Sequence, residues 1–332
     1  MTCLTAALSA NEIPSAALLV LDKADNTLVI VDPVSLKLIG KVPAGEDPHE
    51  VVVSDEGKLA YVSNYGAYGR PGGPLHTISV VDLAAQRALS PIDLGALGAP
   101  HGLAMAGGKV YFTAEASKVI GTYDPAAMRV DWVLGTGQDR THMVVVSKDR
   151  SRIFTTNVSS ATVSIMERGP IANFPGGRGP APIDWHVTVV PVGRGAEGFD
   201  ISPDGKELWV ANAQDRTVSI IDIATKKVAQ TVEVSANGAN RLKLTPDGKL
   251  AFISDPAGSD LIVVDVASRK EAKKIPIGRG GGGILMVPDG SRAFVALGRE
   301  DAVAVIDLRT LVVTGRIQTG KNPDGLAWAA RK

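Results

Sequence analysis

Residues 202–228 read SPDGKELWVANAQDRTVSIIDIATKKV, and two further stretches repeat this pattern with few changes. TPDGKLAFISDPAGSDLIVVDVASRKE begins at Thr245 and VPDGSRAFVALGREDAVAVIDLRTLVV begins at Val287, so the pattern recurs after 43 and then 42 residues. Each copy contains a Pro-Asp-Gly turn, a strand ending near a polar residue, a loop, a strand ending in Asp, a second turn and a fourth apolar strand. Alternating runs rich in β-branched residues favour strands, and a fixed period of this length indicates a repeat architecture.

Weaker copies of the repeat fill the rest of the chain. Six innermost strands are expected to begin at residues 49, 101, 142, 197, 240 and about 283, and the seventh is DGLAWA near the C-terminus. The partners of this last strand are the N-terminal strands ALLVLD and NTLVIVD. The sequence therefore predicts an all-β fold: a seven-bladed β-propeller of four-stranded blades, closed when the C-terminal strand joins the N-terminal strands. It predicts a single propeller domain over residues 15–332.

Several short strings carry a resemblance to a known family. YVSN, WVAN, SPDGK and the VIDL-type strands resemble those of the YVTN or YncE-like seven-bladed β-propeller proteins. The resemblance covers nearly the whole chain and implies an architecture. It implies no single activity, because the family includes binding proteins, and related propellers include lyases, such as virginiamycin B lyase, and metal-dependent oxidoreductases.

Composition and charge exclude several classes of function. Lys plus Arg and Asp plus Glu both total 35, so the formal net charge is zero and no general field attracts nucleic acid or an anionic membrane. Cys3 is the only cysteine, which rules out a disulfide framework and a cysteine-based centre. No apolar run is long enough to span a bilayer. We expect no nucleic-acid partner and no membrane span, and a closed ring does not require an oligomer.

The N-terminal segment differs from the repeats. Residues 1–14 begin MTCLTAALSANE and contain small residues that resemble the tail of a secretory signal peptide, but the basic segment and a full apolar stretch are missing. This pattern favours the remnant of a leader and a periplasmic or secreted protein. A disordered terminus of a cytoplasmic protein is the alternative.

The register of the repeat places one residue of each innermost strand around the mouth of the central channel. Counting back five places from the end of each strand gives His49, His101, His142, Glu197, Asn240, Gly282 and Asp324. Three of the five histidines in the chain thus occupy consecutive blades, and a glutamate follows them. Imidazoles and a carboxylate are ligands for Zn, Fe, Cu, Ni or Mn, and three or four protein ligands with an open side are typical of a catalytic site.

Two functions remain open. The first is an enzyme in which His49, His101, His142 and Glu197 hold one divalent transition metal, with Glu197, Asn240 and Asp324 acting on a small organic substrate; lyase, hydrolase and oxygenase chemistry all fit. The second is a non-catalytic exported propeller that binds a small ligand, peptide or partner protein without metal. No nucleotide cofactor is expected, because GRGGGG at 278–283 precedes a propeller strand rather than a helix.

Polar residues also end the second strand of most blades. We expect these residues to orient the histidines by accepting their second ring N–H, with Glu115 beside His101, or else to cap turns. The candidates are Asn64, Glu115, Asn157 and Asn212. Glu50 directly follows His49, and strict alternation along a strand predicts that it points away from the channel.

Two insertions interrupt the repeat. NYGAYGRPGGPLH, residues 64–76, is expected on the histidine face and offers glycines for mobility. It is predicted to form a substrate lid with Tyr65, Tyr68, Arg70 and His76. The other insertion, residues 168–185, is expected on the opposite face as a packing loop or partner contact.

Overall fold

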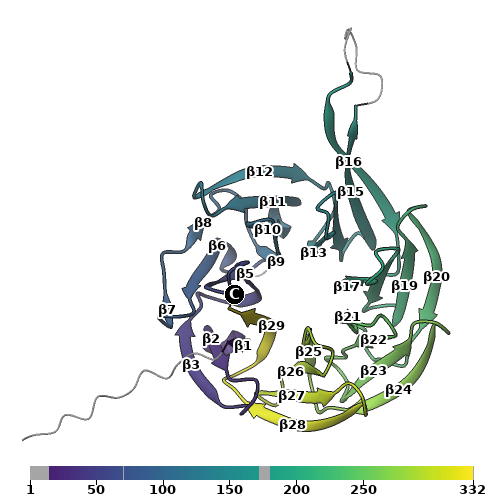
Figure 1. Cartoon of the computed structure of the whole chain (residues 1–332). Helices are drawn as coiled ribbons and strands as arrows, with labels where there is room; N and C mark the ends of the chain where they lie inside the picture. The colour runs from purple at the N-terminus through teal and green to yellow at the C-terminus, as the bar shows by residue number, and fades with distance from the viewer. Residues whose placement is uncertain (1–14, 70, 172–179, 332) are drawn as a thin grey trace, which may run out of the picture.

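The computed structural model describes residues 15–69, 71–171 and 180–331. Within these residues, seven antiparallel sheets stand in a ring around a central axis (Figure 1). Six sheets have four strands, and the seventh has an additional short strand. The predicted seven-bladed β-propeller is therefore confirmed. The segment 1–14, Arg70 and the tip of the second insertion lie outside the described residues.

Each blade runs from an inner strand at the axis to an outer strand at the rim (Figure 1). The inner strands are β4 (Pro48–Val53), β9 (Pro100–Ala106), β13 (Thr141–Val146), β17 (Ala196–Ile201), β21 (Leu242–Leu244), β25 (Gly281–Met286) and β29 (Pro323–Ala330). The second strands are β1 (Ala16–Asp22), β5 (Leu59–Ala67), β10 (Lys109–Ala114), β14 (Arg152–Asn157), β18 (Glu207–Asn212), β22 (Leu250–Ile253) and β26 (Arg292–Leu297). The third strands are β2 (Thr27–Val31), β6 (Gly73–Asp82), β11 (Val119–Asp124), β15 (Thr162–Pro170), β19 (Thr217–Asp222), β23 (Asp260–Asp265) and β27 (Ala302–Asp307).

The outer strands and two short helices complete the fold. The outer strands are β3 (Leu38–Pro43), the broken pair β7 (Arg87–Ala88) and β8 (Ile92–Asp93), β12 (Arg129–Gly135), β16 (Ile183–Pro191), β20 (Lys227–Glu233), β24 (Lys270–Pro276) and β28 (Val312–Gln318). The 3-10 helices are η1 (Lys23–Asp25) and η2 (Glu115–Ser117). Among the described residues, no helix has the length and apolar character needed to cross a membrane.

The C-terminal strand closes the ring, as the repeat predicts. β29 pairs antiparallel with β1, and the sheet runs β29-β1-β2-β3. Leu18 lies opposite Trp328, and Leu19 lies opposite Ala327. One blade is therefore built from both ends of the described chain, so the ring forms only when these ends meet.

The hydrophobic core is divided among the seven blade interfaces. Seven clusters of buried side chains each combine residues of two neighbouring blades. Trp209 is the largest fully buried side chain and packs against residues of the next blade, including Ile253. Because apolar burial is the main favourable contribution to folding, these interfaces hold the ring rigid around its channel.

Most inner strands begin with a β-bulge. The pairing register shifts between Pro48 and Val51 in β4, between Thr141 and Val144 in β13, and at the corresponding places in β17 and β25. A bulge sets two residues against one on the partner strand and breaks the alternation of side chains. Two consecutive residues of one strand can therefore both reach the channel.

Both insertions extend hairpins. β5 and β6 continue their pairing to Ala67 and Gly73, so most of the described part of the segment 64–76 is strand. β15 and β16 continue to the Pro170 and Ile183 pair and project beyond the rim of the ring (Figure 1). The second insertion is thus the root of an extended hairpin arm rather than a loop lying on one face.

Candidate metal centre at the channel mouth

The histidines of three consecutive inner strands meet at the mouth of the channel. The ring centroids of His49 and His101 are 4.9 Å apart, and those of His101 and His142 are 3.8 Å apart. Glu197 of the next strand places Oε2 2.7 Å from Nε2 of His142. Four of the predicted ring residues therefore form one continuous group.

Hydroxyl groups of the second strands hold these channel-mouth residues in place. Thr113 accepts a hydrogen bond from the Gly102 N–H at 2.9 Å and donates to the His142 carbonyl at 2.6 Å. Thr156 likewise donates to the Glu197 carbonyl of the next blade at 2.7 Å, and Ser63 donates to the His101 carbonyl at 2.7 Å. Each hydroxyl thus fixes the backbone of a ring residue in the next blade.

Glu115 belongs to the site, but with a partner other than the expected one. Its carboxylate accepts hydrogen bonds from His142 Nδ1 and from the Tyr65 hydroxyl, the latter at 2.7 Å, and lies 3.3 Å from Arg140 Nε. The sequence placed Glu115 beside His101, whereas the side chain reaches across to the following blade. A carboxylate on Nδ1 fixes the orientation and tautomer of an imidazole, as it does for many metal-bound histidines.

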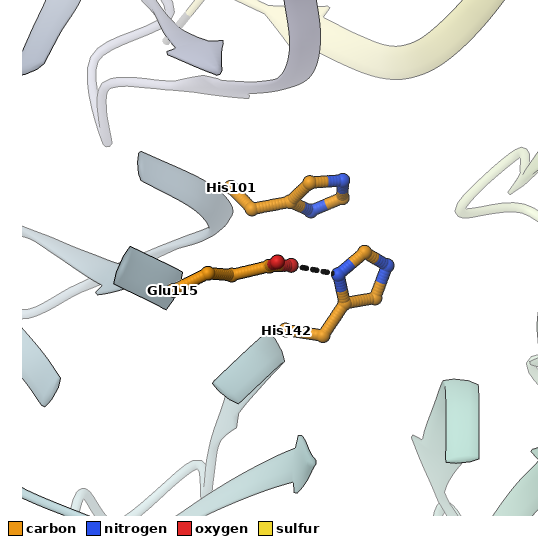
Figure 2. Close-up of side chains that lie close together, drawn as sticks. All are labelled: His101, Glu115 and His142. Atoms are coloured by element: carbon orange, nitrogen blue, oxygen red, sulfur yellow. Dashed lines mark hydrogen bonds and ion pairs between the residues drawn. The ribbon is translucent and has the colours of Figure 1, made fainter. Parts of the chain in front are cut away.

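The donor atoms of His101, Glu115 and His142 converge. One ligand atom from each of these three buried residues lies within 4.8 Å of the other two. Figure 2 shows the two imidazoles near each other, with the Glu115 carboxylate directed at His142. Nδ1 of His101 is buried and has no hydrogen-bond partner among the described residues. Because buried polar atoms are normally satisfied, this nitrogen is available to bind a ligand, an ion or a water.

Electrostatics divide the three histidines into two types. Burial opposes the charged form of His142, but the Glu197 and Glu115 carboxylates outweigh it and raise the pKa of His142 to about 9. In turn, the His142 charge outweighs the burial of Glu197 and lowers the pKa of that carboxyl to about 2. Burial, with the neighbouring His142 and His49, holds the pKa of His101 well below its ordinary value. Without metal, His142 therefore carries a proton at neutral pH and His101 does not.

A lysine that sequence reasoning missed lies against His49. Lys23 Nζ is 2.8 Å from His49 Nε2 and 3.4 Å from Asp324 Oδ2. The other nitrogen, Nδ1, donates to the Asp47 carbonyl at 3.0 Å. Burial and the Lys23 ammonium lower the pKa of His49 to about 4, so this imidazole is neutral with both nitrogens engaged. Lys23 follows directly after the second strand β1, the position that the repeat assigns to the channel mouth.

A second layer lies one residue deeper and contradicts the expectation for Glu50. Arg241 crosses the channel and contacts Glu50 Oε1 at 2.5 Å through Nη2 and Met143 Sδ at 3.0 Å through Nη1. Glu50 therefore points into the channel, as His49 does. The bulge at the start of β4 is the reason, because strict alternation does not hold there.

The asparagines at the ends of the second strands serve their own blades. Asn64 donates to the Ala44 carbonyl at 2.8 Å, and Asn157 and Asn212 each donate to two hydroxyls of the neighbouring third strand. Asn64 therefore caps a loop, which is the alternative role expected from the sequence, whereas Asn157 and Asn212 join two strands of their own blades. Among the described residues, these hydrogen bonds do not reach a ring histidine.

The three remaining ring positions lie on the other side of the mouth. Asn240 precedes β21, and its carbonyl accepts from the Gly198 N–H at 2.8 Å. Gly282 leaves space for its neighbour, since a Cβ there would lie 3.3 Å from Asp324 Oδ1. Asp324 Oδ2 lies 3.4 Å from Lys23 Nζ, and Asp324 Oδ1 lies 3.9 Å from Arg241 Nη2. These two cations outweigh the burial of the Asp324 carboxyl and lower its pKa.

The residues of the predicted lid separate into two groups. Tyr65 is buried and forms part of the wall of the site. The centroid of its aromatic ring lies 4.7 Å from that of His49 and 5.2 Å from that of His101. Tyr68 makes an edge contact with Tyr65 at 6.2 Å. His76 is exposed and lies 3.9 Å from Asp93 on an outer strand, away from the ring histidines. Arg70 lies outside the described residues.

Comparison with known proteins supports the fold. No family model matches the sequence, and no curated protein sequence matches it. A protein of unknown function from Desulfotomaculum acetoxidans matches with a TM-score of 0.75 at 11% identity, over 95% of this chain and 99% of that one. A Bacteroides fragilis protein assigned as a 6-phosphogluconolactonase matches with a TM-score of 0.73 at 16% identity, over 97% and 99%. Hydrazine synthase of Kuenenia stuttgartiensis matches with a TM-score of 0.71 at 17% identity, over 92% and 99%. These similarities show a shared propeller fold and leave the activity to be argued from the site.

Proposed function

We propose that this protein is a metal-dependent enzyme that binds one divalent transition metal at the channel mouth and acts on a small organic molecule. The observation that carries the proposal is the convergence of His101, Glu115 and His142, with a buried His101 nitrogen that has no partner among the described residues. Imidazole nitrogens and carboxylate oxygens suit Zn, Fe, Cu, Ni or Mn. A metal held there would supply Lewis-acid or redox chemistry next to the substrate.

The surrounding residues have roles that follow from their contacts. His101 and His142 are the proposed nitrogen ligands, and Glu115 is the carboxylate with an oxygen within 4.8 Å of one nitrogen of each. Glu197 accepts a hydrogen bond from the protonated His142 Nε2 and is either a further ligand or an acid–base group. His49, predicted as a third nitrogen ligand, has to exchange Lys23 for a metal before it can bind one. Asp324 and Asn240 are at channel-mouth positions of their strands and are the proposed contacts to substrate or water.

The Lys23 contact also favours a second candidate function. An ammonium group on His49 Nε2 is compatible with a propeller that binds a polar organic ligand at its mouth without metal. This would be the non-catalytic, exported binding protein. The YVTN-type resemblance is compatible with both functions, so metal content decides between them.

Metal content tests the proposal. Untagged protein purified without chelator is analysed by plasma mass spectrometry, beside a His101→Ala/His142→Ala variant and a His76→Ala/His186→Ala control whose histidines are exposed. We expect near-stoichiometric metal in the wild type and the control, and its loss in the first variant. Equal metal in both variants, or no metal in any protein after reconstitution, would contradict the proposal and favour the binding protein. Separate Glu115→Gln and Glu197→Gln variants identify the carboxylate ligand.

A further inference from the structure

A cavity of about 350 Å³ lies in the channel below the channel-mouth residues His49, His101, His142 and Glu197. Two of its charged groups are at the upper end, where Glu50 and Arg241 follow directly after His49 and Asn240, and Lys243 lines it two residues deeper. The rest of its lining is mainly apolar and comes from all seven inner strands. The lining includes Val52, Leu103, Met143, Phe199, Ile284 and Trp328.

Arg241 is the unusual residue of this cavity. It is only 8% exposed, yet it reaches Glu50, Met143 and Asp324 on three other blades. A guanidinium has five N–H donors, and here Glu50 and the Met143 thioether accept the only hydrogen bonds that it makes to described residues. A thioether is a weak acceptor, so the buried guanidinium has N–H donors without a strong hydrogen-bond partner among the described residues.

The cavity lining carries two cations and one carboxylate. Arg241 and Lys243 are both in the lining, and Glu50 is the only carboxylate among the lining residues, while just outside it Asp200 lies 3.6 Å from Lys243 and Asp324 lies 3.9 Å from Arg241. A planar guanidinium matches a carboxylate with two parallel hydrogen bonds, and such charged hydrogen bonds are about twice as strong as neutral ones. Apolar walls with a few directed polar groups are typical of sites for small organic ligands.

We propose that the lower channel binds an apolar carboxylic acid, with its carboxylate on Arg241 in place of the Met143 thioether and its apolar body against the walls below. Because a water molecule occupies about 30 Å³ in the liquid, the cavity holds about ten groups of that size, which suits an acid of medium chain length. Glu50 competes with the acid for Arg241. This site is independent of the proposed metal, since none of the three converging metal-ligand candidates lines the cavity.

Isothermal titration calorimetry with octanoate tests this site, and 1-octanol is the uncharged control. We expect wild-type protein to bind one octanoate and to bind 1-octanol at least about tenfold more weakly, because a hydrogen bond to a charged group is worth a factor of this size. Glu50→Gln should tighten octanoate binding by removing the competing carboxylate. Glu50→Gln/Arg241→Gln should strongly reduce the preference for the acid, with only Lys243 left as a cation in the lining, while Asp324 keeps its pair with Lys23.

Two further variants separate binding at Arg241 from general charge attraction and from metal coordination. Arg87→Gln removes an exposed arginine and should leave octanoate binding unchanged. His101→Ala/His142→Ala should also leave it unchanged, which distinguishes the lower site from a carboxylate bound to metal. The proposal would be overturned if the wild type bound no octanoate, or bound octanoate and 1-octanol equally. It would also be overturned if the Glu50→Gln/Arg241→Gln variant, with native circular dichroism, kept its preference for the acid, or if His101→Ala/His142→Ala lost octanoate binding.

Discussion

At the scale of single residues, the central feature of the site is the protonated imidazole of His142 between two carboxylates. Nδ1 faces Glu115 and Nε2 faces Glu197 at 2.7 Å, so two carboxylates share one imidazolium. The His101 imidazole is neutral at the same pH. A metal ligand has to be deprotonated, so the proposed binding of a metal at this centre would release a proton from His142.

The stability of the metal-free protein should depend on pH because of His142. The pKa of this residue rises from an ordinary value of 6.5 to about 9 on folding, so the folded state holds its proton more tightly than the unfolded state. The resulting stabilisation is complete below about pH 6.5 and is lost as pH rises through about 9. We expect urea unfolding of chelator-treated protein to give a decreasing free energy of unfolding over this interval. His142→Gln should flatten the decrease, and an unchanged slope in that variant would refute the assignment.

Bulges and hydroxyl bridges determine the geometry at the scale of the strand. Thr156 on β14 accepts from the Met143 N–H at 3.3 Å and donates to the Glu197 carbonyl at 2.7 Å. The adjacent Thr155 is equally buried, but its hydroxyl has no partner among the described residues. These two threonines form a matched pair, because the same Thr→Val change removes a bridging hydroxyl at Thr156 and a hydroxyl without a partner among the described residues at Thr155.

We expect Thr156→Val to lower the free energy of unfolding by about 1–3 kcal/mol, because it leaves two backbone groups unsatisfied. Thr155→Val removes an unsatisfied hydroxyl and should be neutral or stabilising. Chemical denaturation of both variants measures the difference. If both variants had the same stability, the bridge to Glu197 would not contribute as described.

The repeat predicted the inner strands well because its period and turns fix which residue of each strand reaches the channel mouth. It could not predict the bulges, which depend on how two residues pair against one on a partner strand, and Glu50 was misplaced for that reason. Arg241 meets Glu50 across 191 positions of sequence, a contact that no local pattern contains. Asn64 and Glu115 occupy equivalent strand ends, yet one holds its own blade and the other reaches His142.

Closure of the ring is the property of the whole molecule on which the site depends. Asp324 and its contacts with Lys23 and Arg241 exist only because β29 joins β1. The described ends lie together, since the Arg331 N–H donates to the Ser15 carbonyl at 2.9 Å. The order of the chain is therefore less important than the completeness of the ring.

Deleting residues 323–332 should prevent cooperative folding, because it removes an inner strand and leaves the edge of β1 unpaired. A circular permutant should fold normally if residues 331 and 15 are joined by a short glycine linker and the chain is opened at the exposed turn between Asp204 and Gly205. Circular dichroism and thermal unfolding compare the two proteins with the chain 15–331. Native-like unfolding of the truncated protein would show that closure is not required.

The most direct test of the central claim is the position of the metal itself. Anomalous diffraction at the absorption edge of the bound metal should give one strong peak in crystals of protein purified without chelator. We predict that this peak lies about 2.0–2.2 Å from one nitrogen of His101 and one nitrogen of His142, with a carboxylate oxygen of Glu115 or Glu197 completing the protein ligands. A peak bound only by other residues, or no peak in reconstituted protein, would contradict the assignment of the channel mouth as a metal centre.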